Sequence, residues 1–588
     1  MTRRWVVGCG SWAVGGLLLA QMAAAQAPRE SEDVIVRAMT EELQRWQPMR
    51  FSPLAPAYFI EYAVHDGEMV SAAATLGSLL HTRRVPYRMP RVQVRVGGYD
   101  SDSTSFVGTG FYSGTRWDVD QFPLDNSYPV LRHHLWLATD VAYKAAVESM
   151  SRKRAILASM APGEQLPDFA RAEPLRKLED GRPAPVDLGA WNERLQRLSA
   201  LFAAYPEVQQ SAVEFDASGG LHYLLNTEGA LVRLPEHMLQ VRVRAAAQAP
   251  DGMPLRDSAL FCALAAAGLP SELDLERGTR QVAENLTALV RAPVGEAYTG
   301  PVLFEGLAGP QILAEVLGRQ FAVPRRPLSP PGRPAPFQPS ELEGRLGVRI
   351  LPEWMDVVDD PTQREWRGRA LFGHYRADLE AVAPVPVVLV EKGTLKSFLL
   401  TRQPVRGATG SNGRARLPGP FGAKTATFSN LFVRAAQGVP PAELRRRLVE
   451  LCRQRNKPYA ILIRKMDYPS VASFDELRRI AAASGGARPV SPPILAYRVY
   501  PDGREELIRG LRFRNLNTRS FRDILAASQE THVFDFLDSG APLGISAGAG
   551  YLAECSVIAP SILVDDLELE RPQEELTRPP LAPPPPLK

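Results

Sequence analysis

The sequence has few cysteines and little net charge. Beyond its first 25 residues it holds only Cys262, Cys452 and Cys555, which are far apart and form no CxxC motif. This pattern predicts no disulfide framework, and Cys262 and Cys452, in apolar stretches with helical spacing, are expected to be buried free thiols. The net charge is only +4, and the lysines and arginines are scattered along the 588 residues. A nucleic-acid-binding protein would show a concentrated basic face, so no nucleic-acid partner is predicted.

Long hydrophobic runs are absent apart from one at the N-terminus. There Arg3 and Arg4 precede the apolar residues 5–19, and small residues follow up to Ala25. This order predicts a signal peptide, residues 1–25, and an exported protein, periplasmic or extracellular. A membrane anchor is the alternative, but the run is short for a span of about 20 residues. No later run is long enough, so no membrane span is expected after signal removal.

The sequence does not decide between two export routes. Residues 2–7 form a partial twin-arginine pattern, and a lipoprotein-like box precedes Cys9 but lies before most of the apolar run. A lipidated cysteine should instead follow that run. Sec and twin-arginine export therefore remain as alternatives.

Common catalytic motifs are also missing. None of the eight histidines belongs to an HExxH or HExxxH motif, and no GxxxxGK[ST] loop is present. Residues 544–548 match GxSxG by letters, yet further glycines follow them and no histidine lies beyond His532. A serine nucleophile needs a following helix and a later histidine, so a glycine-rich turn is the preferred interpretation.

The remaining pattern is that of an α+β protein. Helical spacing of apolar residues marks 33–46, 130–157, 191–203, 279–292 and 440–455, and alternation marks strands between them. We expect an N-terminal helix/sheet domain, a small central domain and a strand-rich C-terminal domain. The boundaries are a signal peptide at 1–25, then 26–208, 209–292 and 293–572, and a proline-rich tail at 573–588.

A hairpin is expected at residues 387–400. Two apolar stretches flank the turn at Lys392 and Gly393. The two-residue period of strands predicts that Val388 and Val390 face away from Leu389. Seven prolines in residues 324–339 exclude a helix or a central strand there.

Three segments carry a resemblance to a known family. Residues 387–416, 429–450 and 559–570, in that order, resemble the C-terminal domain of the TldD/PmbA metallopeptidase family. Active members hold zinc through an HExxxH helix and a cysteine near the C-terminus, with the glutamate as general base. The resemblance places Glu305 at the family glutamate, and the loop holding Asn412 and Gly413 beside a substrate-binding central cavity. The other interpretation of this loop, a tight turn that needs positive φ, is the preferred one.

The zinc ligands of the family are substituted in this chain. The two histidine positions hold Phe304 and Gly309, and the cysteine position falls near Ser546 and Ala547. We therefore predict no bound metal or other cofactor, and locally a strand ending near Phe304, a turn and a packing helix. Glu305 remains as the one candidate catalytic residue.

The resemblance implies the zinc-less, PmbA/TldE-like branch. This chain is then expected to pair with a homologous zinc-bearing subunit around a peptide-processing chamber, or to form a homodimer. The predicted function is a non-catalytic subunit or peptide-binding scaffold in proteolysis, with a peptide as ligand. The alternatives are an active metallopeptidase with unrecognised metal ligands and a purely structural exported protein. Enzyme activity, substrate and oligomeric state stay open.

Overall fold

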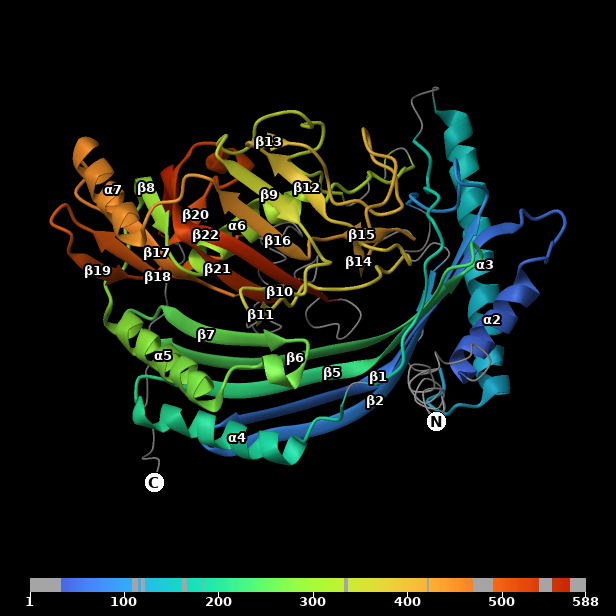
Figure 1. Cartoon of the computed structure of the whole chain (residues 1–588), viewed down its shortest axis with the longest axis horizontal. Helices are drawn as coiled ribbons and strands as arrows, with labels where there is room; N and C mark the ends of the chain where they lie inside the picture. Colours follow the sequence, from blue (N-terminus) through green and yellow to red (C-terminus); the bar gives the residue numbers. More distant parts are fainter. Residues whose placement is uncertain are drawn as a thin grey trace, which may run out of the picture.

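Two large β-sheets lie one above the other (Figure 1). The computed structural model describes residues 33–107, 115–117, 122–160, 166–182, 184–330, 332, 337–419, 422–468, 490–538 and 552–571. The predicted signal peptide, the GxSxG match, Ser546, Ala547 and the proline-rich tail lie outside these ranges. Among the described residues, helices and strands alternate as in an α+β protein, so the predicted fold class is confirmed.

The lower, curved sheet in Figure 1 is built mainly from four long antiparallel strands of 17 to 19 residues. Its order is β3-β2-β1-β5-β6-β4, with β7 paired to β6. The bounds are β1 Ala57–Thr75, β2 Ser78–Val96, β3 Thr115–Trp117, β4 Arg176–Leu178, β5 Gln210–Asn226, β6 Leu231–Gln248 and β7 Pro254–Ala263.

The predicted boundary at 208/209 falls inside this sheet, because β1 before it pairs with β5 after it over fourteen residue pairs. Residues 57–263 thus contribute to one layer. The sequence shows local periodicity but not which distant strands share hydrogen bonds. The change from long amphipathic helices to short strands bounded by glycines after residue 208 therefore resembles a domain boundary.

Four helices cover one face of the curved sheet. α2 (Val34–Trp46) and α3 (Tyr128–Ser159) pack on one end of it, in a core that includes Ile60, Val92 and Leu135. α4 (Leu188–Ala200) and α5 (Glu272–Arg291) pack on the other end against Phe215 and Val241. Asp33 and Asp187 cap α2 and α4 by accepting from the first-turn amides, which fixes where these helices begin.

The second sheet has eleven strands in the order β13-β12-β9-β16-β22-β8-β17-β18-β19, with β20 and β21 paired to β22. Its bounds are β8 Tyr298–Phe304, β9 Met355–Asp359, β12 Val387–Glu391, β13 Thr394–Leu395, β16 Asn430–Ala435, β17 Ala460–Met466, β18 Pro493–Val499, β19 Glu505–Ile508, β20 Arg512–Arg514, β21 Ile524–Asp538 and β22 Ala553–Glu570. Two short hairpins complete this half: β10 (Glu365–Trp366) with β11 (Arg369–Ala370), and β14 (Ala415–Pro418) with β15 (Lys424–Ala426).

Two helices pack on opposite faces of this sheet. Ile312 and Leu313 of α6 (Ala308–Val316) join the large core on one face, and Leu444 and Leu448 of α7 (Pro441–Gln454) pack on the other. The short 3₁₀ turns are η1 Leu201–Ala204, η2 Ala266–Gly268, η3 Gly318–Phe321 and η5 Thr518–Phe521. None of the described helices is both long and apolar enough to cross a membrane.

The hairpin at Lys392 and Gly393 is present but shorter than predicted. β12 and β13 pair from Val390 to Leu395, and both turn residues have positive φ, +48° and +72°. Val388 is exposed, but Val390 is as deeply buried as Leu389. The predicted alternation is wrong at Val390, because the register of β12 against β9 shifts after Val388 and turns Val390 inward.

The thiols are free, as predicted, but one of them lies in an unexpected element. Cys452 is buried on α7, and Cys555 is buried on β22. Cys262 lies on β7, not on a helix, and it is only partly buried. The apolar stretch 259–269 has helical spacing, but the strand β7 continues to Ala263 and only the short 3₁₀ turn at Ala266–Gly268 follows it.

Candidate functional site

The predicted strand, turn and helix around Glu305 are all present. β8 ends at Phe304 and α6 begins at Ala308, with Pro310 in the first turn of the helix. Phe304 is fully buried and its ring lies 5.9 Å from that of Phe513. The residue at the first family ligand position is therefore part of the hydrophobic core.

Glu305 is bound by two arginines. Arg445 Nε donates to Glu305 Oε1 at 2.7 Å, and Arg464 Nε donates to Glu305 Oε2 at 2.9 Å. Arg464 in turn lies 2.8 Å from Glu505. Burial alone would raise the pKa of Glu305, but the hydrogen bonds and charges of Arg445 and Arg464 hold that pKa below its ordinary value of 4.5. A carboxylate held in this way is a poor proton acceptor.

Replacing Glu305 with glutamine is expected to lower the melting temperature at neutral pH and to matter less in acid. Because the folded pKa of Glu305 is lowered, its stabilisation is fully present above the unfolded value near 4.5 and is lost as the pH falls through the folded pKa. Thermal unfolding from about pH 7 to about pH 3 measures this. The exposed Glu343→Gln is the control. A pH-independent difference would contradict the assignment.

Gly309 leaves no room for a ligand. A Cβ at this position would lie 2.4 Å from the carbonyl oxygen of Pro560 and 3.1 Å from the Cα of Ser561. Both of those atoms belong to the backbone of β22, which packs directly on α6. A histidine cannot be accommodated here without moving α6 or β22. The residues at the family zinc position thus do not fit the metal.

Asn412 and Gly413 form a turn that bonds to its own neighbours. The Asn412 side chain accepts from the amide of Leu400 at 2.8 Å and donates to the carbonyl oxygen of Phe398 at 2.8 Å. Gly413 has a φ of +74°, and a Cβ there would lie 2.7 Å from Pro384 Cα. The polar atoms of the Asn412 side chain are engaged in holding the loop.

A cavity of about 920 Å³ lies between the two sheets. Its walls come from the long strands β1, β5 and β6 and from the second half of the chain. Glu305, Asn412 and Gly413 are not among the described residues that line it. Side chains that do line it include His65, Met238, Arg242, Arg364, Tyr375 and Arg416.

Three potential metal ligands meet on the wall of this cavity. His65 and His222 are opposite each other on β1 and β5, and their rings stack with centroids 4.2 Å apart. His222 Nδ1 lies 3.1 Å from Glu236 Oε1, and His65 Nδ1 lies 3.5 Å from Glu236 Oε2. Burial and the nearby His222 lower the pKa of His65, which favours its neutral, metal-binding form.

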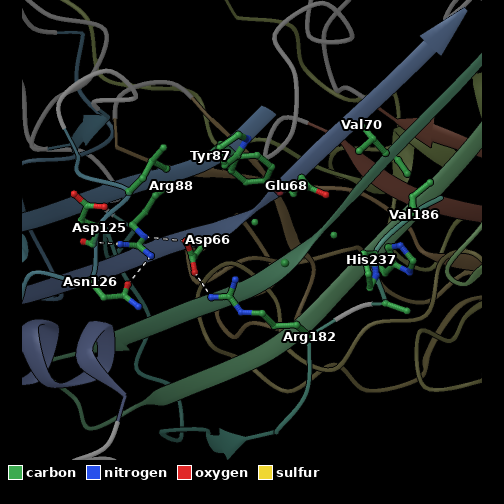
Figure 2. Close-up of a pocket in the computed structure, with 18 residues that line it drawn as sticks. Asp66, Glu68, Val70, Tyr87, Arg88, Asp125, Asn126, Arg182, Val186 and His237 are labelled. Atoms are coloured by element: carbon green, nitrogen blue, oxygen red, sulfur yellow. Dashed lines mark hydrogen bonds and ion pairs between the residues drawn. The ribbon is translucent and has the colours of Figure 1, made fainter. Parts of the chain in front are cut away.

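A second cavity, of about 600 Å³, lies on the outer face of the curved sheet (Figure 2). There the guanidinium groups of Arg88 and Arg182 both point at Asp66, and Arg88 also bonds to Asn126. Arg88 is buried and has accepting oxygens on every nitrogen. This ion-pair cluster satisfies its own charges, so it indicates a structural role.

The C-terminal half carries the family signature. Residues 328–452 match the PmbA/TldA metallopeptidase C-terminal domain. This part of the chain is similar to the C-terminal domain of the TldD/PmbA family. The matched range contains the hairpin at Lys392 and all but the last two residues of α7, two of the three segments in which the resemblance was seen.

Curated relatives match over short segments. A metalloprotease of Archaeoglobus fulgidus is 38% identical over 78 residues, 13% of this chain and 17% of that protein. A metalloprotease of Methanothermobacter thermautotrophicus is 42% identical over 64 residues, 11% of this chain and 13% of that protein. The chain is thus matched over less than a fifth of the length of either relative.

Solved structures match nearly the whole chain. TldE from Thermococcus kodakarensis superposes with a TM-score of 0.56 at 12% identity, covering 90% of this chain and 99% of that one. A putative modulator of DNA gyrase from Thermotoga maritima gives 0.55 at 13% identity, covering 92% and 99%. At these identities the likeness shows the fold.

Sequence reasoning missed the cluster of His65, His222 and Glu236. Each residue is isolated in the sequence, and the two histidines are 157 positions apart. Only the pairing of β1 with β5 and of β5 with β6 brings them together. The alternation of apolar and polar residues in β1 predicts which residues of that strand share a face. It does not predict which residues of β5 lie opposite them.

Proposed function

We propose that this chain is an exported, non-catalytic member of the TldD/PmbA family that binds peptides in the cavity between its two sheets. Packing at Gly309 supports this most directly, because the backbone of β22 occupies the space that a zinc ligand would need. The glutamate that would activate water is held by Arg445 and Arg464. A peptide-processing role would then depend on a zinc-bearing homologous subunit.

The cavity has the size and lining of a ligand site. Its volume of about 920 Å³ falls within the range of roughly 300–1,000 Å³ that is usual for such sites. Apolar side chains such as Met69 and Met238 alternate there with charged ones. Arg364 lies at its edge and forms no ion pair with any residue that the structure describes. An exposed guanidinium of this kind suits the carboxylate of a peptide.

Arg364→Glu is expected to weaken the binding of peptides with a free C-terminal carboxylate about fivefold, and to leave their C-terminally amidated forms unaffected. One exposed charge contact contributes up to about 1 kcal/mol, which corresponds to that factor. Fluorescence anisotropy with labelled peptide mixtures measures the affinities. Arg434→Glu, on β16 and outside the cavity lining, is the matched control.

Two results would contradict the proposal. One is the absence of measurable peptide binding by the wild-type protein. The other is peptide hydrolysis that a chelator abolishes and that Glu305→Gln also abolishes, since Glu305 would then be a catalytic base. Partner dependence is tested by mixing the protein with a family member that carries HExxxH and measuring complex formation by light scattering.

An active metallopeptidase with other ligands is the second candidate. One observation favours it: two histidines and a glutamate that could hold a metal face the same cavity. Hydrolysis that is sensitive to a chelator but insensitive to Glu305→Gln would support this candidate over the first.

A further inference from the structure

Three neighbouring strands of the curved sheet bring His65, His222 and Glu236 to one point on the cavity wall. His65 and His222 are direct cross-strand partners. Glu236 pairs with Gly220, two residues from His222, so its side chain lies on the same face as both imidazoles. Each residue offers one ligand atom, and the three atoms lie within 4.8 Å of one another. Among the described residues this is the group of His, Cys, Asp and Glu side chains that could hold a metal ion.

The spacing of these atoms suits one small cation. The two imidazole Nδ1 atoms lie 3.1 Å and 3.5 Å from the oxygens of the same carboxylate. Donors around a tetrahedral zinc ion, with bonds of about 2.1 Å, stand about 3.4 Å apart. The donor atoms of the two imidazoles lie within 4.8 Å of each other, so rotation of the stacked rings would have to direct both toward one ion.

The surroundings leave a coordination position open on the cavity side. Glu236 is 54% exposed, whereas His222 is 3% exposed and anchors the group in the sheet. On the same face, the next residues along β1 and β5 are Gly67 and Gly220, and neither has a side chain that could cover the site.

We propose that His65, His222 and Glu236 bind a divalent transition-metal ion of the zinc type. Two histidines, one glutamate and a free fourth position are the donor set of catalytic zinc sites. The proposal does not rest on peptide binding in the cavity. It places the metal on the N-terminal sheet, while the family position at Phe304, Glu305 and Gly309 remains without ligands.

The test measures metal binding directly. The full-length mature protein is stripped with a chelator, dialysed, and titrated with Zn²⁺ in competition with a chromophoric chelator. Co²⁺ is used as a spectroscopic probe, because its visible absorption reports coordination geometry. One ion per chain is expected to bind. Glu236→Gln keeps the side-chain size and is expected to weaken Zn²⁺ affinity about 10- to 100-fold. His222→Ala is expected to do the same.

Two variants serve as controls. His237→Ala removes a histidine that lines the same cavity but stands outside the cluster, and it should leave Zn²⁺ affinity unchanged. Glu305→Gln tests the family position and should also have no effect. Circular dichroism confirms that each variant is folded, and Glu236→Gln decides the matter if His222→Ala does not fold, since Glu236 is largely exposed.

The outcomes separate this inference from the proposed function. Failure of the wild-type protein to bind Zn²⁺ or Co²⁺ at one ion per chain, or binding that Glu236→Gln leaves unchanged, would overturn the metal site and say nothing against peptide binding. Binding lost in Glu305→Gln but retained in Glu236→Gln would overturn both. Loss confined to the cluster variants, with the tetrahedral Co²⁺ absorption lost in parallel, would establish the site.

Discussion

Asp359→Ala is expected to lower the free energy of unfolding by about 3–5 kcal/mol, because it leaves a buried guanidinium without its counter-ion. Asp359 Oδ2 lies 2.5 Å from Arg414 Nε, and both side chains are completely buried. Asp359 Oδ1 also accepts from the amide of Ser429 at 2.8 Å. Arg414 further donates to the carbonyl oxygens of Val385 and Asn412, so the pair ties β9 to two loops of the family domain.

Urea unfolding of the wild-type and variant proteins measures this loss. Asp140→Ala is the control, because Asp140 pairs with Lys144, whose side chain is 71% exposed. Such a surface pair contributes less than about 1 kcal/mol. The double variant Asp359→Asn with Arg414→Met removes both charges and should recover part of the loss. If Asp359→Ala lowered the free energy of unfolding by no more than the control does, the Arg414 guanidinium would be hydrated in the variant, which would contradict its burial.

Gly309→Ala is expected to destabilise the protein by about 1–3 kcal/mol, the usual cost of overpacking. Elsewhere in a helix the same substitution would stabilise by up to about 1 kcal/mol, through the higher helix propensity of alanine. The loss at Gly309 arises because the new Cβ would meet the carbonyl oxygen of Pro560 at 2.4 Å. Thermal and urea unfolding measure it.

Gly410→Ala provides the matched control for Gly309→Ala. A Cβ at Gly410 meets no atom within 4 Å, so its stability should be unchanged or slightly raised. If Gly309→Ala were as well tolerated as Gly410→Ala, the space at α6 would be larger than the structure shows. In that case the packing argument against a histidine at position 309 would weaken, and with it the case against zinc at the family position.

Both predictions concern the packing of the second half of the chain. Asp359 and Arg414 hold together the part of the chain that carries the family signature, whereas Gly309 closes the position where active members bind zinc. The family domain is thus held by buried polar contacts even though its metal position is filled by packing.

Several local features could be predicted from the sequence. The strand ending at Phe304, the turn at Glu305 and the helix after it follow from an apolar run, a glycine and a proline in the first helical turn. The turn at Lys392 and Gly393 follows from two apolar stretches around a glycine. These signals are local, because each depends on residues only a few positions apart. The bulge that buries Val390 depends on β9 and could not be predicted.

The sequence by itself determined the α+β class, the family segments and the absence of zinc-binding side chains at positions 304 and 309, because these are properties of residue types and short-range periodicity. The tertiary structure alone decided that Gly309 has no room for a side chain, that Glu305 is held by two arginines, and that His65, His222 and Glu236 meet on the cavity wall. These contacts join elements separated by up to 251 positions along the chain, as between Gly309 and Pro560. They arise only when strands pair and helices pack, which local sequence patterns do not specify.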